Sequence, residues 1–181
     1  MLRTLSLGLA ALLPLCPLWG AAASAEERTT PFQIGLVAPV RALPASWSVA
    51  GVRLGGIYGH NHNVTGVDLG FANRTEGDQL GLQSGVYNEV DGSLTGCQLS
   101  LVGSDVDGRA QGAQLALGFN SAELAVGAQL SVMANRATRL RGRQIALVNW
   151  AEEVDGGLQI GLVNINRNGF LPVLPLFNWG N

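Results

Sequence analysis

The fold is decided by the stretch Gly157-Leu158-Gln159-Ile160-Gly161-Leu162-Val163-Asn164, because the chain keeps repeating it. The opening glycine recurs every 15 residues, with a single interval of 16, as Gly51, Gly66, Gly81, Gly96, Gly112, Gly127, Gly142 and Gly157. Two residues after these glycines come Arg53, Asp68, Gln83, Gln98, Gln114, Gln129, Gln144 and Gln159. A fixed short period is typical of stacked-repeat architectures. Looser copies flank the array at 33–37 and 174–178, which makes about ten units.

The first half of each unit alternates with period two. After Gly112, for example, the side chains of Ala113, Leu115 and Leu117 are apolar, whereas the intervening positions hold Gln114 and a small residue. Such alternation predicts a strand with one buried face. We therefore predict that the leucines face the core and that the glutamine column lies on the opposite face.

The fold class predicted from this pattern is all-β, a β-solenoid of about ten 15-residue rungs with end caps. In that fold equivalent residues stack about 4.8 Å apart, so Gln lies over Gln and Asn over Asn. Asn closes many repeats and suits a corner, because it tolerates left-handed backbone. A small antiparallel β-barrel is the alternative, since ten strand-like runs is an even number. Uniform turn chemistry favours the solenoid, because successive turns of a meander lie at opposite ends.

The N-terminus predicts export. Residues 1–25 combine a basic Arg3, an apolar run over 5–18 and a small-residue cleavage site at 23–25, which together are typical of a secretory signal peptide. A lipoprotein signal using Cys16 is less favoured, because Leu15 stands where a small residue is normally needed. The rest divides into an N-terminal cap with a degenerate repeat (26–50), the repeat array (51–170) and a C-terminal cap (171–181). Prolines in that last segment suit an edge strand.

Charge and cysteine content narrow the function class. The chain has no lysine and a formal net charge of −2, which argues against a general nucleic-acid binder. Removal of residues 1–25 leaves Cys97 as the only cysteine, so we expect no intrachain disulfide and a buried, unreactive thiol. No later segment has the roughly 20 apolar residues of a transmembrane helix.

Two clusters are candidate sites, each with a structural alternative. His60 and His62 could share a metal ion, with Asp68 as a third ligand, but a polar corner between rungs is favoured because a zinc site needs more ligands. A basic cluster could bind phosphate groups of lipopolysaccharide or another anionic polymer; it consists of Arg136, Arg139, Arg141 and Arg143. Pairing with the acidic residues at 152–155, one repeat later, is the favoured interpretation.

The glutamine column could form a flat polar face that binds ice or a repetitive polysaccharide. Structural ladders along the stack are the favoured interpretation. The two histidines lie in one tripeptide, so no Ser-His-Asp or Cys-His arrangement can be assigned, and we expect neither catalysis nor a cofactor.

The order of these blocks resembles a known family. Val49-Ala50-Gly51-Val52-Arg53-Leu54 is followed by the segment 58–70, by Gly-x-Gln-Ile-Gly-Leu-Val-Asn copies and by Leu171-Pro172-Val173-Leu174-Pro175-Leu176-Phe177-Asn178. Together these blocks, over about residues 31–179, are similar to exported bacterial surface-repeat proteins. Departures from the pattern occur at Ala38, Ser100, Gly103, Ala116 and Ser131.

The resemblance implies a secreted or cell-surface protein and supplies no catalytic residues. We therefore expect a structural or interaction role in the periplasm, at the outer membrane or on the cell surface. The partner would be a cell-envelope component or a surface polysaccharide. An outer-membrane β-barrel is the alternative, and a binder of an anionic or repetitive polysaccharide is a lesser one.

Overall fold

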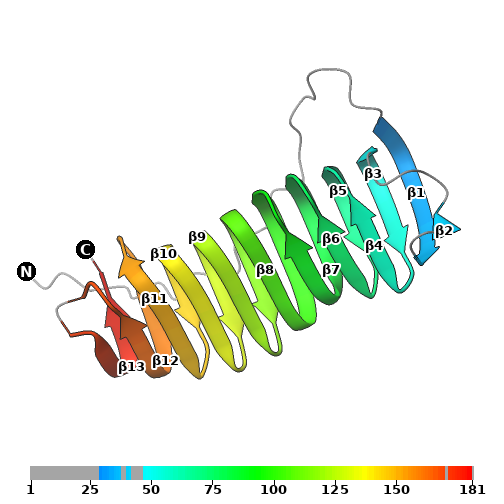
Figure 1. The fold of residues 1–181 in the computed structure, drawn as a ribbon. Helices are drawn as coiled ribbons and strands as arrows, with labels where there is room; N and C mark the ends of the chain where they lie inside the picture. The colour runs from blue at the N-terminus through cyan, green and yellow to red at the C-terminus, as the bar shows by residue number, and fades with distance from the viewer. Residues whose placement is uncertain (1–28, 38–39, 42–46, 170, 181) are drawn as a thin grey trace, which may run out of the picture.

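Parallel pairing of consecutive repeats winds the chain into a β-solenoid of about eight turns. The computed structural model describes residues 29–37, 40–41, 47–169 and 171–180, so the expected signal peptide and Cys16 lie outside the described residues. The strands are β1 (Thr29–Val37), β2 (Val40–Arg41), β3 (Ser48–Gly55), β4 (Tyr58–Asn61), β5 (Val64–Leu69), β6 (Ala72–Thr75), β7 (Gln79–Val90), β8 (Leu94–Ala116), β9 (Phe119–Ser131), β10 (Ala134–Ile145), β11 (Val148–Val154), β12 (Leu158–Asn166) and β13 (Val173–Trp179). Figure 1 shows them side by side in an elongated stack, from β1 at one end to β13 at the other.

The register follows the sequence period. Gly66 pairs with Gly51 and with Gly81, and Gly112 pairs with Gly127, each time in parallel. This parallel pairing confirms the predicted solenoid and excludes the alternative, a small antiparallel β-barrel. Each turn contributes two strand segments. The first side of the coil holds the repeat glycines and glutamines, as in residues 79–84 of β7, and the second side holds the segments that follow, such as residues 87–90.

The two ends differ in strand direction. β1 pairs in parallel with β3 and aligns Gln33 with Arg53, so the degenerate first copy belongs to the coil. β13 instead runs antiparallel to β12 and sets Trp179 opposite Leu158. The loose copy at 174–178 is therefore not a rung: it folds back over the last turn, which is one reason why the coil has about eight turns rather than ten.

The predicted alternation is present, but its direction is opposite to the prediction. Gln114 is 1% exposed, whereas Leu117 is 59% exposed. Leu115 is half-buried and points away from the interior with Leu117. The prediction that Leu115 and Leu117 face the core is wrong, because an amide column can satisfy itself inside a stack of identical rungs and an aliphatic core is not required there.

A ladder of glutamine side chains runs through the interior. The Nε2 of each glutamine donates to the Oε1 of the glutamine one turn earlier, at 2.7–2.9 Å. The ladder consists of Gln83, Gln98, Gln114, Gln129, Gln144 and Gln159, all of them buried. The Gln83 amide continues the series by donating to Asp68 at 3.0 Å. The expectation of structural glutamine ladders is confirmed, and the column is not available as a surface for ice or polysaccharide.

A second ladder is built from the corner asparagines. The Nδ2 of Asn135 donates to the Oδ1 of Asn149 at 3.0 Å, and Asn149 donates to Asn164 at 2.9 Å. These bonds point toward the C-terminal end of the stack, opposite to those of the glutamine ladder. The ladder is interrupted where Ser104 lies between Asn88 and Asn120 in the register. Asn120 is fully buried and its Oδ1 has no hydrogen-bond partner among the described residues.

The apolar core comes from the second half of the repeats. Leu94 and Leu140 are completely buried, and Val154 is 6% exposed. Together with small side chains they form one cluster: Val90, Leu94, Val106, Ala110, Ala122, Ala125, Ala137, Leu140, Ala151 and Val154. The interior is therefore apolar toward one corner of the coil and amide-lined toward the other.

The repeat glycines stand where backbones meet. Gly112 has φ 127°, a conformation that disfavours a side chain, and a Cβ added there would overlap the carbonyl oxygen of Gly96. The same conflict recurs at the other repeat glycines up to Gly142. Gly157 is the exception, because its nearest backbone atom would lie 3.0 Å away. Close approach of consecutive turns thus explains the glycine period.

Cys97 is the only cysteine in the part of the chain that the structure describes. Its side chain is buried, with 4% exposure, as expected. The prediction of an unreactive thiol concerns the chain after removal of residues 1–25, which lie outside the described residues.

Candidate interaction surface

The outward side chains of the first side form a largely apolar surface, with Ser84 and Gly56 as the exceptions. We call this surface the aliphatic face and define it by the third and fifth positions after each repeat glycine. The third positions are Leu54, Leu69, Ser84, Leu99, Leu115, Leu130, Ile145 and Ile160, and the fifth positions are Gly56, Phe71, Val86, Leu101, Leu117, Val132, Leu147 and Leu162. At the fifth position the exposed fraction reaches 58% for Leu101, 55% for Val132 and 62% for Leu162. A folded chain thus leaves whole rows of large aliphatic side chains in water.

The aliphatic face is grooved along the stack axis. A shallow groove of about 490 Å³ lies between the two aliphatic rows. Its walls come from four consecutive turns and its floor includes small side chains; the lining residues are Leu99, Ser100, Leu101, Leu115, Ala116, Leu117, Leu130, Ser131, Val132 and Ile145. Corner asparagines bond the backbone of this segment from the interior: Asn120 donates to the Leu130 carbonyl at 2.9 Å and Asn135 donates to the Ile145 carbonyl at 3.0 Å.

The second side carries charge where the first side carries aliphatic groups. Arg74 aligns with Glu89, and Glu89 aligns with Asp105, in one outward row. Exposed charged side chains continue along this side at Arg109, Glu123 and Arg139. By contrast, Arg143 is the only charged residue at the first, third and fifth positions after the repeat glycines. The two outer sides of the solenoid are therefore chemically opposite.

The four arginines of the basic cluster do not act together. Arg139 Nε donates to Glu153 at 3.0 Å and Arg141 Nε donates to Asp155 at 2.7 Å, one turn away. The Arg136 guanidinium lies over the Trp150 ring, with 4.9 Å between Cζ and the ring centroid. Arg143 has no acidic partner among the described residues. The inter-rung pairing favoured from the sequence is present for two of the four.

His60 and His62 both lie beside Glu76 rather than beside Asp68. The His60 Nε2 to Glu76 Oε1 distance is 2.8 Å, and His62 Nδ1 is 3.6 Å from Oε2 of the same carboxylate. Asp68 is fully buried and bound to Arg53. Within the described residues, no group of three or more His, Cys, Asp and Glu side chains is arranged to hold a metal ion.

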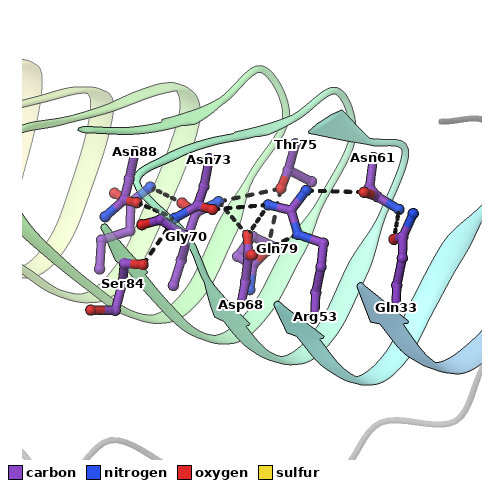
Figure 2. Close-up of polar contacts among 12 residues, drawn as sticks. Gln33, Arg53, Asn61, Asp68, Gly70, Asn73, Thr75, Gln79, Ser84 and Asn88 are labelled. Atoms are coloured by element: carbon purple, nitrogen blue, oxygen red, sulfur yellow. Dashed lines mark hydrogen bonds and ion pairs between the residues drawn. The ribbon is translucent and has the colours of Figure 1, made fainter. Parts of the chain in front are cut away.

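A buried ion pair ends the glutamine ladder near the N-terminus. Arg53 Nε donates to Asp68 Oδ1 at 2.6 Å, Nη2 contacts Oδ2 of the same carboxylate, and Nη1 donates to Asn61 at 3.0 Å. Asn61 in turn donates to Gln33. Figure 2 shows the guanidinium between these partners. Arg53 and Asp68 occupy the glutamine positions of their turns but are 2% and 0% exposed, so this cluster is closed to a ligand and serves the stack.

Two ionisable groups on the second side have shifted pKa values. A hydrogen bond with Asp91, followed by the charge of Glu89, raises the pKa of Arg74. Partial burial, with smaller contributions from Asp105, Glu89 and Asp107, raises the pKa of Tyr87. Neither shift changes the charge at neutral pH, because arginine is already protonated and charged there and tyrosine is already protonated and uncharged.

No protein-family model, curated protein or solved structure matches the chain. In the part of the chain that the structure describes, no helix is long and apolar enough to cross a membrane. The surface chemistry is therefore the basis for a functional proposal. The sequence indicated the basic and histidine clusters as candidate sites. It did not indicate the aliphatic face, because the prediction assigned the residues of that face to the core.

Proposed function

We propose that this chain is an exported bacterial repeat protein that works as a rigid interaction rod, without catalysis. The observation that carries the proposal is the aliphatic face. Monomeric soluble proteins rarely expose contiguous apolar patches larger than a few hundred Å², and larger ones mark interaction sites. A row that includes Leu101, Leu117, Val132 and Leu162, each more than half exposed, is such a patch.

The interior supports a binding role over a chemical one. Amide ladders and the small apolar cluster fill the coil, so the groups available to a partner are those on its outer sides. The period fixes those groups in rows, because every turn repeats the one before it. A surface of this kind offers a partner many equivalent contacts at regular spacing. The partner class that we propose is a component of the cell envelope.

The proposed location rests on residues 1–25. Their basic, apolar and small-residue segments are typical of a secretory signal, with cleavage before Glu26. Export would place the rod in the periplasm, at the outer membrane or on the cell surface, where its apolar surface meets envelope components.

The test follows the full-length chain in a Gram-negative host. We expect an N-terminus at Glu26 by mass spectrometry and recovery outside the cytoplasm. The double variant Leu115→Arg/Leu130→Arg should be exported and folded but lose its association with other molecules in native extracts. Thr138→Arg, an exposed position on the second side, is the matched control and should behave as the wild type. An unprocessed cytoplasmic chain, or a double variant that associates as the wild type does, would contradict the proposal.

A further inference from the structure

We propose that the aliphatic face docks a second copy of this chain, face to face. This inference rests on the proposed function, since a second copy of the exported chain would itself be the envelope component that the surface binds. It begins from the exposure of two parallel aliphatic rows with the groove between them. The groove is lined by side chains from four consecutive turns, and its apolar walls are continuous along the axis.

The size of the face matches what a stable dimer needs. Strands stack about 4.8 Å apart, so the nine parallel rungs from β1 to β12 extend over about 40 Å. The outward columns from the first to the fifth position span about 13 Å of extended chain, or about 20 Å with their side chains. The product is on the order of 800 Å², which is the surface that each partner contributes to a standard protein interface. Burial of the whole face therefore requires a partner of similar length and flatness.

The relief of the face is complementary to itself. Each copy offers a ridge at the third position, a groove, and a second ridge at the fifth position, all running along the stack axis. A ridge of one copy fits the groove of the other. The side chains along a ridge recur once per rung, and a second copy repeats at the same interval along its whole length. A two-fold axis makes such a contact isologous, the commonest arrangement of homodimers.

Charge favours a second copy over a lipid surface. A helix or sheet that binds anionic lipid carries basic residues around its apolar face. Here Arg143 is the single charge within the three outward columns of the first side, and its neighbour Arg141 is paired with Asp155. The chain as a whole has a net charge of −2. An uncharged protein face is the better match for this surface.

The two-fold axis that seats ridges in grooves runs along the stack, so the two rods are parallel. Rotation about that axis exchanges the two edges of the face. The first-position column, which holds Arg143, therefore lies at opposite edges of the interface in the two copies, and the like charges do not meet. A two-fold axis across the stack would instead set each ridge opposite the equivalent ridge.

The test is the mass of the purified full-length protein, as processed by its host, by sedimentation velocity. Between about 1 and about 100 µM we expect a dimer. Leu115→Arg/Leu130→Arg should weaken the dimer by at least about 30-fold, as expected for charges in the centre of an interface. Thr138→Arg should leave it unchanged. A photo-crosslinker at position 130 should label residues around Val132 of the other copy, and labelling around Leu69, far along the stack, would overturn the parallel arrangement.

Three outcomes separate this inference from the proposed function. A monomeric wild type at about 100 µM overturns the second copy, whatever the variants do. A monomer that binds vesicles of phosphatidylcholine and phosphatidylglycerol through Leu115 and Leu130 also overturns it, yet supports an interaction role for the face. If the double variant does not fold, Leu117→Ser replaces it, because Leu117 is 59% exposed in the single chain. A dimer unaffected by that change would contradict the proposal.

Discussion

The inside and the outside of the first side are made by alternate residues of the same strands. Gln114 and Leu117, three residues apart, are 1% and 59% exposed. The glutamine is stable inside because its amide bonds to the equivalent amides one turn before and one turn after, at 2.9 and 2.8 Å. The leucine would gain from burial, but on this side of the coil the amide column already occupies the interior. A stack of identical rungs therefore allows polar groups to fill the interior and releases the aliphatic groups for an outer surface.

The hydrogen bonding in the middle of the glutamine ladder differs from that at its N-terminal end. In the middle each glutamine both donates and accepts along the stack. At the end Asp68 accepts from Gln83 on one side and from Arg53 on the other. The amides of the ladder donate toward the N-terminus, so the N-terminal end needs an acceptor, which the Asp68 carboxylate supplies. Arg53 balances the buried negative charge, and without this pair the ladder would end on an unsatisfied donor.

The largest expected effect comes from breaking this end. Arg53→Met leaves the Asp68 carboxylate buried without its cation and should lower the free energy of unfolding by about 3–5 kcal/mol, measured by urea denaturation. The matched control is Arg53→Gln/Asp68→Gln, which extends the glutamine ladder by two rungs. This double variant should recover most of the loss. A single variant as stable as the wild type would show that the pair does not support the stack.

The glycine period gives the next largest effect. Gly112→Ala places a Cβ against the Gly96 carbonyl at a φ of 127° and should destabilise by about 2–4 kcal/mol. Gly157→Ala is the control, since its nearest backbone atom is 3.0 Å from the new Cβ. It should cost less than half as much by the same denaturation measurement. Equal losses would mean that backbone approach is not what selects glycine.

A gain of stability is expected where the asparagine ladder is interrupted. Ser104→Asn, combined with Ser100→Ala to remove the hydroxyl that now bonds Ser104 at 3.0 Å, gives the Asn120 Oδ1 a donor from the preceding turn. Satisfying one buried acceptor should raise the free energy of unfolding by about 1 kcal/mol. Ser100→Ala alone is the control and should not raise stability. A double variant less stable than this control would show that an asparagine does not fit the corner.

The smallest effect is expected on the outer charged side. Arg139 and Glu153 are 52% and 45% exposed, so a double-mutant cycle with alanine should give a coupling energy below about 1 kcal/mol. The coupling should fall further in about 1 M salt, where screening is strong. A larger, salt-independent value would place this pair among the supports of the fold.

Much of the architecture could be predicted from the repeat. The glycine interval predicts the register, Gly66 on Gly81 and Gly112 on Gly127, and the uniform turns favour parallel pairing over a meander. The corner asparagines and glutamine ladders also follow from the sequence. The antiparallel direction of β13 does not, because a loose copy of the repeat pattern carries no signal for strand direction.

The inward direction of the strands could not be decided from alternation alone. Period two defines two faces and says only that they differ. The assumption that apolar residues are buried then chose the wrong one. Two signals in the sequence favour a buried glutamine column. The second half of the repeats already supplies apolar core residues, namely Leu94, Leu140 and Val154. In addition, Arg53 and Asp68 lie 15 residues apart in the glutamine column. Opposite charges one repeat apart in a column are a signature of a buried pair.

The central claim is that the amide column is the inside and the leucine column the outside. The most direct measurement compares Gln114→Ala with Leu117→Ala by urea denaturation, at a protein concentration low enough to keep the chain monomeric. We predict that Gln114→Ala lowers the free energy of unfolding by about 1–3 kcal/mol, because it leaves Gln98 and Gln129 without their buried partner, and that Leu117→Ala lowers it by less than about 0.5 kcal/mol. The opposite order, with a loss of about 2–5 kcal/mol for Leu117→Ala, would mean that the leucines are the core after all.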